Sequence, residues 1–407
     1  MRRRRINGLS WLPTKSPFRY AFETAGISGG HLLGRPTKSE RRIYDFRMSF
    51  SITTTTAPTP AERRAEILAD PGFGRFFTDH MATAEWTVDE GWQELRVRPL
   101  EPFSMHPGVG VLHYGQEIFE GLKAYRHADD SLQLFRPDMN AARFARSARR
   151  LALPEFPPEL FLEAMDELVR VEADWVPPHG DEASLYLRPI EFASEAFLGV
   201  RSSRTAMFCT VASPAGAYFS GGVKGIRLWV TTKYTRAAVG GTGDAKCGGN
   251  YAGSLLAQTE AQEQGCDQVL YTSGPPERRI LEEAGTMNIV LITRSGELVT
   301  PGLGTILPGV TRDSVLTLAP EHGLVPVERE IPLEELVSGC RSGEIVEVFA
   351  AGTAAVITPI VALAGEGFEV TVGAGEPGSA ALTLREHLLG VQHGDLPDAH
   401  GWIRRVC

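Results

Sequence analysis

The sequence predicts a two-domain protein of the α+β or mixed α/β class. A chain of 407 residues is too long for one ordinary hydrophobic core, so two domains are expected. Strand-like apolar runs occur together with segments whose apolar residues recur every three or four positions, as they do on one face of a helix. No internal repeat of about 20–50 residues is present, which argues against solenoids and propellers.

Composition and charge exclude several classes of protein. The chain is 43% hydrophobic and 22% charged, as expected of a globular protein, and no apolar run approaches the roughly 20 residues of a transmembrane helix. The net charge of −9 argues against a nucleic-acid-binding surface. The five cysteines are widely spaced without a CxxC pair, which predicts a reducing, cytoplasmic compartment and neither a metal site nor a disulfide framework.

The first 59 residues are expected to be a basic leader outside the folded domains. Residues 1–47 hold eleven Lys and Arg and only three acids, and they open with four consecutive arginines. Arg-rich, acid-poor segments are typical of organelle transit peptides. The leader shows no amphipathic helical period, which favours the other interpretation, that Met48 is the native start and the preceding residues are a translated upstream stretch. Under either interpretation the leader is expected to be disordered.

Residues 60–211 are expected to form the smaller N-terminal α/β domain. Its predicted strands are 95–97, 132–135, 184–188 and 205–211, and its predicted helices are 140–151 and 158–173. Residues 212–225 are rich in Gly, Ser and Pro and follow a predicted strand. This composition is typical of an interdomain linker.

Residues 226–407 are expected to form the larger C-terminal domain, in which strands and helices alternate. The predicted strands are 226–231, 268–272, 288–293, 345–349 and 368–372, and the predicted helices are 250–264, 311–319, 332–337 and 380–389.

Lys246 lies in the glycine-rich run GGTGDAKCGGNY, directly before a predicted helix. Glycines let a backbone approach a ligand closely, and the start of a helix favours anions. A nucleotide-binding loop would need Gly-Lys-Ser/Thr, but Ala245 precedes this lysine and Cys247 follows it. On the pattern alone a solvated loop lysine is the simpler interpretation, so the neighbouring motifs decide its role.

Glu282 and Glu283 are consecutive acids before a small-residue turn and an apolar strand, in EEAGTMNIV. A carboxylate buried at the edge of that strand would need a cationic partner, and the protonated ring nitrogen of a ligand would serve. The alternative is that both acids are solvated turn residues.

Two later turns are candidate anion sites. A Pro-Gly turn delivers Val310 and Thr311 to a helix start, where unpaired N–H groups and the helix dipole favour negative charge. The strand at 345–349 runs into the turn Ala-Gly-Thr-Ala around Thr353, which offers N–H groups and one hydroxyl. An ordinary helix start and an ordinary tight turn are the alternatives.

A different class of function is suggested by Gly373, Gly375 and Gly378, which match the G-x-G-x-x-G pattern of NAD-dependent oxidoreductases. The pattern lies too close to the C-terminus for the further strands of a dinucleotide-binding fold. Pro377 also removes a backbone donor where a pyrophosphate would need one. The nicotinamide interpretation is therefore disfavoured.

Taken together, these segments resemble the branched-chain amino-acid aminotransferases, the larger members of the fold-type IV pyridoxal-phosphate enzymes. The resemblance runs from residue 73 to residue 402. Its motifs occur in the family's order: FTDHM, LHYGQEIFEGLKAYR, FRPDMNAARFARSARRLALP, LYLRP, GAYFSGG, AKCGGNY, EEAGTMN, LPGVTR and FAAGTAAVITP. The G-x-G-x-x-G segment followed by Leu384 and Arg385 is itself a feature of this family.

The resemblance implies a D-amino-acid-aminotransferase-like fold whose larger domain binds pyridoxal 5′-phosphate. Lys246 would carry the cofactor as a Schiff base and move the α-proton. Glu283 would pair with the pyridine nitrogen, and Tyr251 would hydrogen-bond the ring oxygen. The phosphate would be held by Arg143, Val310, Thr311 and Thr353.

The resemblance also implies a substrate pocket that accepts both a branched aliphatic side chain and that of glutamate. Its expected apolar walls are Phe77, Tyr114, Phe119 and Tyr218. Its expected carboxylate-binding residues are Tyr186 and Arg188, with Arg188 suited to the distal carboxylate of glutamate, and Thr286 and Ala354 for the α-carboxylate. The alternative for Phe119 and Tyr218 is an ordinary core position.

The activity implied is reversible transamination of L-leucine, L-isoleucine and L-valine with 2-oxoglutarate by a homodimer. Close rivals are a D-amino-acid aminotransferase and an aminodeoxychorismate lyase, but those relatives are shorter and lack LYLRP. A non-catalytic cofactor-binding protein is a more distant rival. Some animal members carry a CxxC pair after the Gly-Thr-Ala turn. Those positions are Ala355 and Thr358 here, so thiol regulation at that place is not expected.

Overall fold

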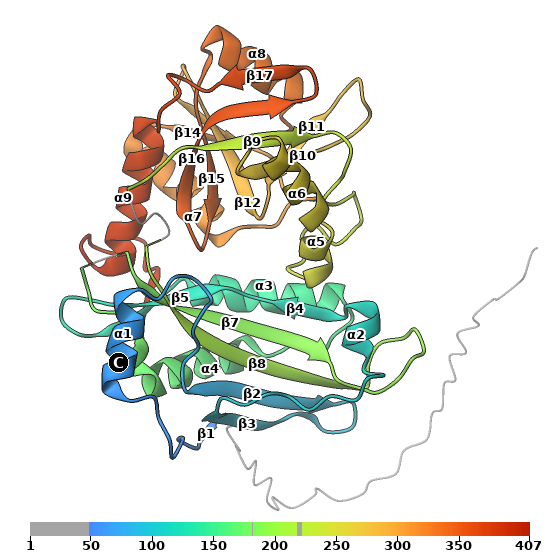
Figure 1. The fold of residues 1–407 in the computed structure, drawn as a ribbon, viewed down its shortest axis with the longest axis vertical. Helices are drawn as coiled ribbons and strands as arrows, with labels where there is room; N and C mark the ends of the chain where they lie inside the picture. The colour runs from blue at the N-terminus through green and yellow to red at the C-terminus, as the bar shows by residue number, and fades with distance from the viewer. Residues whose placement is uncertain (1–48, 181, 218–221) are drawn as a thin grey trace, which may run out of the picture. The chain divides into compact units, whose positions relative to one another are not determined.

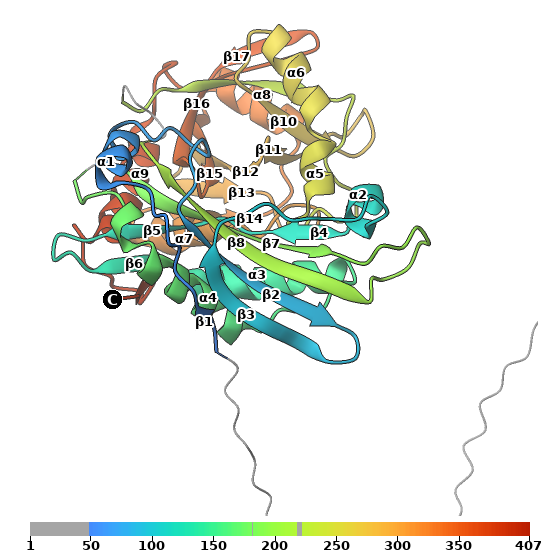
Figure 2. The same cartoon turned by 60° about the horizontal axis from the view of Figure 1, so that its bottom comes forward.

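The computed structural model describes residues 49–180, 182–217 and 222–407, which fold around two sheets (Figures 1 and 2). The first sheet has the strand order β1–β3–β2–β8–β7–β5–β6–β18, with β4 also paired to β7. Its pairings are antiparallel except that of β1 with β3. Its strands are β1 (Ser51–Ile52), β2 (His80–Thr87), β3 (Gly91–Pro99), β4 (Glu117–Phe119), β5 (Leu122–Arg126), β6 (Leu132–Phe135), β7 (Ser184–Ala193), β8 (Thr205–Ala215) and β18 (Ile403–Arg405).

The second sheet has the order β11–β10–β9–β16–β15–β12–β13–β14, with β17 paired to β16 and β11 also paired to β12. It is mixed, because β9 runs parallel to both β10 and β16 and β13 runs parallel to β14. Its strands are β9 (Ile226–Thr231), β10 (Gln268–Ser273), β11 (Ile280–Ala284), β12 (Met287–Thr293), β13 (Glu297–Thr300), β14 (Val325–Glu328), β15 (Ile345–Gly352), β16 (Val356–Gly365) and β17 (Phe368–Thr371). Two sheets with helices packed on them confirm the predicted fold class.

The helices cover these sheets, α3 and α4 against the first and α6 to α9 against the second (Figure 1). Their bounds are α1 (Ala61–Ala69), α2 (Gly110–Tyr114), α3 (Pro137–Arg150), α4 (Pro158–Val171), α5 (Gly248–Ala252), α6 (Leu255–Glu263), α7 (Val310–Leu318), α8 (Leu333–Ser342) and α9 (Ser379–His393), with short 3₁₀ turns at Ala173–Trp175 and Ala319–His322. Both α3 and α4 begin with proline in the first turn, where its missing N–H costs no hydrogen bond.

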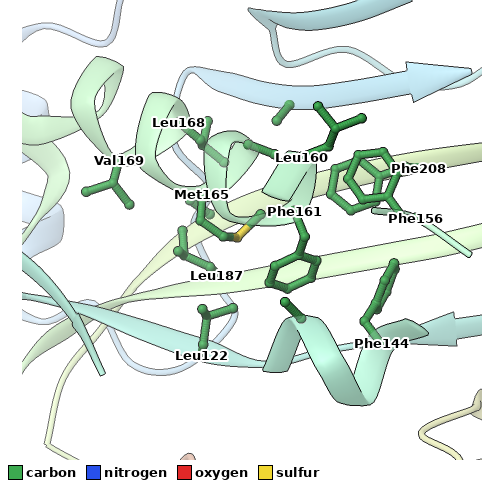
Figure 3. Packing of buried hydrophobic residues seen from close by; sticks show 14 of the residues in the cluster. Leu122, Phe144, Phe156, Leu160, Phe161, Met165, Leu168, Val169, Leu187 and Phe208 are labelled. Carbon is green, nitrogen blue, oxygen red and sulfur yellow. The ribbon is translucent and has the colours of Figure 1, made fainter. Parts of the chain in front are cut away.

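The first core fills the space between α3, α4 and the first sheet (Figure 3). Phe156 stacks on Phe208 of β8 with ring centroids 4.1 Å apart, and β7 contributes Leu187 to the same cluster. Because side chains alternate along a strand, the neighbours Tyr186 and Arg188 point to the opposite face of β7. The amphipathic pattern of this strand thus buries one face and leaves two polar side chains for the other.

The second sheet is covered on both faces. Successive side chains of β15 point to opposite faces and pack in two different clusters. Val348 and Ala350 pack in one cluster with Leu336 of α8, while Phe349 packs in another with Val315 of α7 and residues of α9. A strand buried on both faces is expected to be almost wholly apolar, and most of β15 is.

Three local features differ from the sequence-based expectation. Residues 49–59, expected to belong to a disordered leader, are ordered, because Phe50 is buried in the first core and β1 pairs with β3. Residues 212–215, expected to begin the linker, continue β8, whose pairing with β7 extends to Ala215. The helix expected over 250–264 is divided into α5 and α6, with Gly253 and Ser254 between them, since glycine has a low helix propensity.

The division into a smaller N-terminal and a larger C-terminal domain stays a prediction. The short β18 belongs to the first sheet although it lies at the end of the chain. The remaining leader, residues 1–48, lies outside the described residues. Within the described part of the chain, no helix is both long enough and apolar enough to cross a membrane.

Glu191 on β7 provides a test of the fold, because its side chain is fully buried and neither carboxylate oxygen has a hydrogen-bond partner among the described residues. Burial raises the pKa of this carboxyl well above its usual value of 4.5. The folded state therefore keeps a proton that the unfolded chain releases. The stabilisation from that proton is complete below about pH 4.5 and is lost as the pH rises toward the folded-state pKa.

We expect Glu191→Gln to become progressively more stable than the native protein as the pH rises from 5 to 8. The slope is about 1.4 kcal/mol per pH unit between the two pKa values. Midpoints of urea unfolding at several pH values measure it. Glu366→Gln, in the exposed turn between β16 and β17, is the control. A Glu191→Gln difference that does not vary with pH would contradict a proton held at this position.

Candidate active site

A cavity of 190 Å³ brings together residues from both sheets and the loop before α5. Eight of the predicted site residues line it. They are Phe119, Tyr186, Arg188, Lys246, Tyr251, Thr286, Thr353 and Ala354.

Lys246 is fixed through its backbone. Its N–H donates to Ser147 Oγ on α3 at 2.9 Å, and its carbonyl accepts the N–H of Phe119 at 2.9 Å. Its amine Nζ then lies 2.8 Å from Tyr251 Oη and 4.7 Å from the centroid of the Phe119 ring. The lysine side chain is therefore held toward the cavity. The simpler interpretation of the sequence, a solvent-exposed loop lysine, is not what the structure shows.

The electrostatic surroundings make this amine easier to deprotonate than an ordinary lysine. Burial first, and then the charge of the nearby Arg143 guanidinium, lower the pKa of Lys246 to about 8. The Tyr251 hydroxyl has its pKa raised to about 12, by burial first and then by the charge of Glu283. At neutral pH the phenol is therefore a hydrogen-bond donor, and a neutral Lys246 amine is accessible at small cost.

Glu283 is a buried residue of β11. Of the two alternatives from the sequence, a buried carboxylate and a solvated turn residue, the structure shows the first. Its Oε1 accepts the backbone N–H of Leu307 at 2.6 Å and Asn288 Nδ2 at 3.1 Å. Its Oε2 lies 2.9 Å from Nε of Arg236. The expected cationic partner was the ring nitrogen of a ligand; Arg236 is a second cation that the sequence does not reveal, because the two residues are far apart in the chain.

The start of α7 carries Val310 and Thr311, the residues of the predicted anion site. Its N-cap residue is Gly309, and no side chain among the described residues caps the helix. Val310 and Thr311 are both buried there, so solvent has little access to this end of the helix. Nη1 of Arg143 donates to the carbonyl of Pro308 at 3.0 Å, which places a guanidinium beside the same turn. Uncapped N–H groups next to a cation favour a bound anion.

Arg143 also forms a doubly hydrogen-bonded ion pair with Glu120. Its Nε and Nη2 each lie 2.7 Å from a Glu120 oxygen, and Asn140 Nδ2 donates to the same carboxylate at 2.7 Å. Burial alone would raise the pKa of Glu120, but Arg143 outweighs it and the pKa lies below its usual value. Glu120 lies in the LHYGQEIFEGLKAYR motif, and its role as the partner of Arg143 is not apparent from the sequence.

The turn between β15 and β16 carries Thr353 and Ala354 at the cavity wall. Val356, just after it, has a φ of +61°, which is rare for a β-branched residue. Lys123 Nζ donates to the Ala354 carbonyl at 2.9 Å. Strained backbone of this kind persists only where the surroundings fix it, which agrees with a turn shaped for a ligand.

On the facing side, β7 presents Tyr186 and Arg188. Arg188 Nη2 donates to Tyr186 Oη at 2.9 Å, and its guanidinium lies 5.0 Å from the centroid of the Phe119 ring. A Cβ at Gly121 would lie 2.0 Å from Tyr186 Oη, so only glycine leaves room for the phenol there. The result is a cation and a phenol above an aromatic wall.

Two predicted wall residues, Phe77 and Tyr114, are not brought to the cavity. Phe77 is 50% exposed and Tyr114 is 46% exposed, and neither is among the described residues lining the cavity. The Tyr114 hydroxyl donates instead to the carbonyl of Leu198. Tyr218 lies outside the described residues, so its place in the wall stays a prediction.

The aromatic residue that lines the cavity in place of Phe77 is Phe73, which meets Tyr186 edge to face at 5.0 Å. Phe73 lies just before the FTDHM motif, which begins at Phe77, and neither residue lies in a helix or strand whose period could have separated them. Other lining residues that the sequence analysis missed are Gly121, Gln268, Met287, Gly352 and Ala355.

The G-x-G-x-x-G segment takes no part in this site. Gly378 is the N-cap of α9, and the Glu347 carboxylate accepts the N–H groups of Ala380 and Ala381 at 3.0 and 2.9 Å. A carboxylate of the protein itself therefore occupies the place where a pyrophosphate would sit in a nicotinamide enzyme.

Comparison with known proteins gives consistent matches. The model of the class IV amino-transferase family matches residues 117–363. A branched-chain-amino-acid aminotransferase from Mycolicibacterium smegmatis is 51% identical over 363 residues, covering 88% of this chain and 98% of the relative.

Solved structures agree with the sequence matches. The branched-chain amino acid aminotransferase of Escherichia coli aligns with a TM-score of 0.66 at 27% identity, covering 80% of this chain and 100% of that one. The branched-chain amino acid aminotransferase of Thermobaculum terrenum, solved in its PLP form, aligns with a TM-score of 0.63 at 25% identity, covering 81% of this chain and 98% of that one.

Proposed function

Because the chain belongs to the class IV aminotransferase family, we propose that it transfers the amino group of L-leucine, L-isoleucine and L-valine to 2-oxoglutarate, reversibly. The products are branched-chain 2-oxo acids and L-glutamate. The observation that supports this most is the cavity itself. It places a lysine amine between an aromatic wall topped by Arg188 and the turn at Thr353 and Ala354.

The cofactor in this proposal is pyridoxal 5′-phosphate, and the residues present fit it. The uncapped start of α7 and Arg143 suit its phosphate, and Thr353 lines the cavity. Glu283 suits its ring nitrogen and Tyr251 its ring oxygen. When bound, the cofactor supplies an aldehyde that reacts with amines and a ring that withdraws electrons from the substrate.

The residues of the chain would supply binding and proton transfer. Lys246 holds the cofactor and carries the proton that leaves Cα of the amino acid, a task that suits an amine with a pKa of about 8. Tyr251 orients that amine through its hydroxyl. Glu283 holds a proton at the ring nitrogen.

Substrate recognition would use the two opposite sides of the cavity. Phe73 and Phe119 pack against an aliphatic side chain, while Arg188 and Tyr186 bind the distal carboxylate of glutamate in the same space. Ala354 and Thr286, which both line the cavity, would take the α-carboxylate. The proposal includes a homodimer and a cytoplasmic location.

Initial rates with a panel of amino donors and 2-oxoglutarate test this function. L-leucine, L-isoleucine and L-valine should be good donors, and double-reciprocal plots should be parallel because both half-reactions share one site. D-alanine serves as the comparison, since a D-amino-acid aminotransferase would prefer it. Release of pyruvate from aminodeoxychorismate would instead indicate the lyase. A purified protein that binds no pyridoxal phosphate would refute the proposal.

The dual pocket gives a second expected result. Arg188→Met should lower kcat/KM for L-glutamate by about 10- to 100-fold, because a charged hydrogen bond is worth about 1.5–3 kcal/mol. The value for L-leucine should change by less than about threefold, since its side chain needs only the apolar wall. Arg201→Met, which removes an exposed arginine paired with Glu195, is the control. Equal losses for both substrates would show that Arg188 does not discriminate between them.

A further inference from the structure

We infer that Arg236 is a positioning residue, whose guanidinium keeps the Glu283 carboxylate ionised and fixed so that it can hold a proton at the cofactor's ring nitrogen. The inference rests on the proposed function, because it assigns Glu283 to that nitrogen. It adds a residue to which neither the sequence motifs nor the family match gives a role.

The first observation is the geometry of the buried pair. Nε of Arg236 lies 2.9 Å from Oε2 of Glu283, and the two side chains are 4% and 2% exposed. The other oxygen, Oε1, is held by the N–H of Leu307 and the amide of Asn288. Each carboxylate oxygen thus has its own donors, which fixes the plane of the carboxylate.

The second observation is that Arg236 connects two loops of the site. Its Nη1 donates to the carbonyls of Gly243 and Thr305, each at 3.3 Å. Gly243 is in the loop that leads to Lys246, and Thr305 is in the segment that leads to α7. A Cβ at Gly243 would lie only 1.9 Å from the Thr305 carbonyl oxygen, so the two loops can approach only at a glycine.

Charge explains why an arginine is needed and a neutral donor would not do. Burial raises the pKa of Glu283 to about 7, and the largest opposing influence is the charge of Arg236. Without that charge the carboxyl would be mostly protonated at neutral pH. A neutral acid carries no negative charge to stabilise a protonated ring nitrogen, and its O–H would donate to the unprotonated nitrogen instead. The electron-withdrawing power of the ring would then fall.

A purely structural role for Arg236, as a tie between the loops, is the alternative to be distinguished. Arg236→Gln keeps N–H groups that can reach the loop carbonyls but removes the charge. Arg236→Lys keeps the charge. If Arg236 only ties the loops together, both substitutions should impair the protein. If its charge matters, only Arg236→Gln should do so.

The decisive readout is the ionisation of Glu283 in the cofactor-free protein. Difference infrared spectroscopy follows the protonated carboxyl during a pH titration, and the signal is assigned by its loss in Glu283→Gln. We expect the titration midpoint to rise by about one pH unit or more in Arg236→Gln, because an opposite charge at this range shifts a carboxyl by about 1–3 units. In Arg236→Lys the midpoint should stay close to the native one. An unchanged midpoint in Arg236→Gln would overturn the inference.

The holoenzyme gives a second readout. In Arg236→Gln, kcat for L-leucine should fall by about 10- to 1,000-fold with KM changed by less than about threefold, and Arg236→Lys should recover most of the loss. Equal losses in both variants would indicate a structural tie and overturn the electrostatic role.

Two arms keep the inference testable on its own. If the native enzyme proves to have another activity, the infrared titration still decides whether Arg236 controls Glu283. If Arg236→Gln does not fold, the Nε–H resonance of Arg236 in the native protein, labelled with ¹⁵N-arginine, must titrate with the Glu283 midpoint. An Arg236 signal insensitive to that ionisation would overturn the inference without any variant.

Discussion

Replacing Lys246 with alanine is expected to reduce transamination of L-leucine by at least about 10⁴-fold. The substitution removes both the amine that holds the cofactor and the base that moves the α-proton, and a positioned acid–base group alone contributes about 10²–10⁴ in rate. The fold should be retained, because Lys246 is placed by its backbone bonds to Ser147 and Phe119, which alanine keeps. Steady-state rates and the circular dichroism spectrum measure the two expectations.

Lys233→Ala is the matched control, since Lys233 is exposed and pairs with Glu260. Borohydride should bleach the near-visible absorbance band of the native enzyme and of this control. In Lys246→Ala that band should be absent before borohydride is added. Small primary amines such as methylamine should restore part of the lost rate, because they can enter the space that the side chain leaves. Full activity in Lys246→Ala would refute the role of this lysine and, with it, the mechanism.

Local sequence singled out candidate residues in loops, although the pattern around Lys246 did not by itself decide its role. Lys246 precedes α5 in a glycine-rich run, and the start of α7 follows a Pro-Gly turn, so position along the chain revealed both. The alternation along β7 likewise implies that Tyr186 and Arg188 share a face. These features are encoded within a few residues, and the structure places Lys246 before α5, Val310 at the start of α7, and Tyr186 and Arg188 on the cavity wall.

Partners that lie far apart in the chain were not predictable in this way. Glu283 pairs with Arg236, and Arg143 pairs with Glu120, across sequence separations that no helical or strand period spans. Burial requires each of these charges to have a partner, but it does not say which residue supplies it. The sheets decide that by bringing separate loops together.

Residues in irregular segments were the other source of error. Phe73 and Phe77 are equally apolar and lie in a stretch without helix or strand, so the sequence pattern does not show which of them faces the cavity. Where backbone direction is set by turns rather than by a repeating period, side-chain direction has to come from the structure.

The buried pair of Glu120 and Arg143 gives the largest expected effect on stability. We expect Glu120→Gln to destabilise the protein by about 3–5 kcal/mol, because it leaves the Arg143 guanidinium buried without its counter-charge. Glu120 is fully buried and Arg143 nearly so, so solvent cannot compensate. Urea unfolding measures this effect. A parallel titration with pyridoxal phosphate should show weaker binding, because Arg143 would no longer be held beside Pro308.

The double variant Glu120→Gln with Arg143→Met separates charge from packing. Removing both charges should restore a large part of the stability lost in Glu120→Gln, because replacing both members of a buried pair is often close to neutral. Cofactor affinity should not recover, since the proposed phosphate ligand is gone. A double variant that loses the sum of the two single effects would mean that the pair contributes through shape alone. Recovery of stability without recovery of cofactor affinity would instead separate the two roles of Arg143: balancing the charge of Glu120 and binding phosphate at the start of α7.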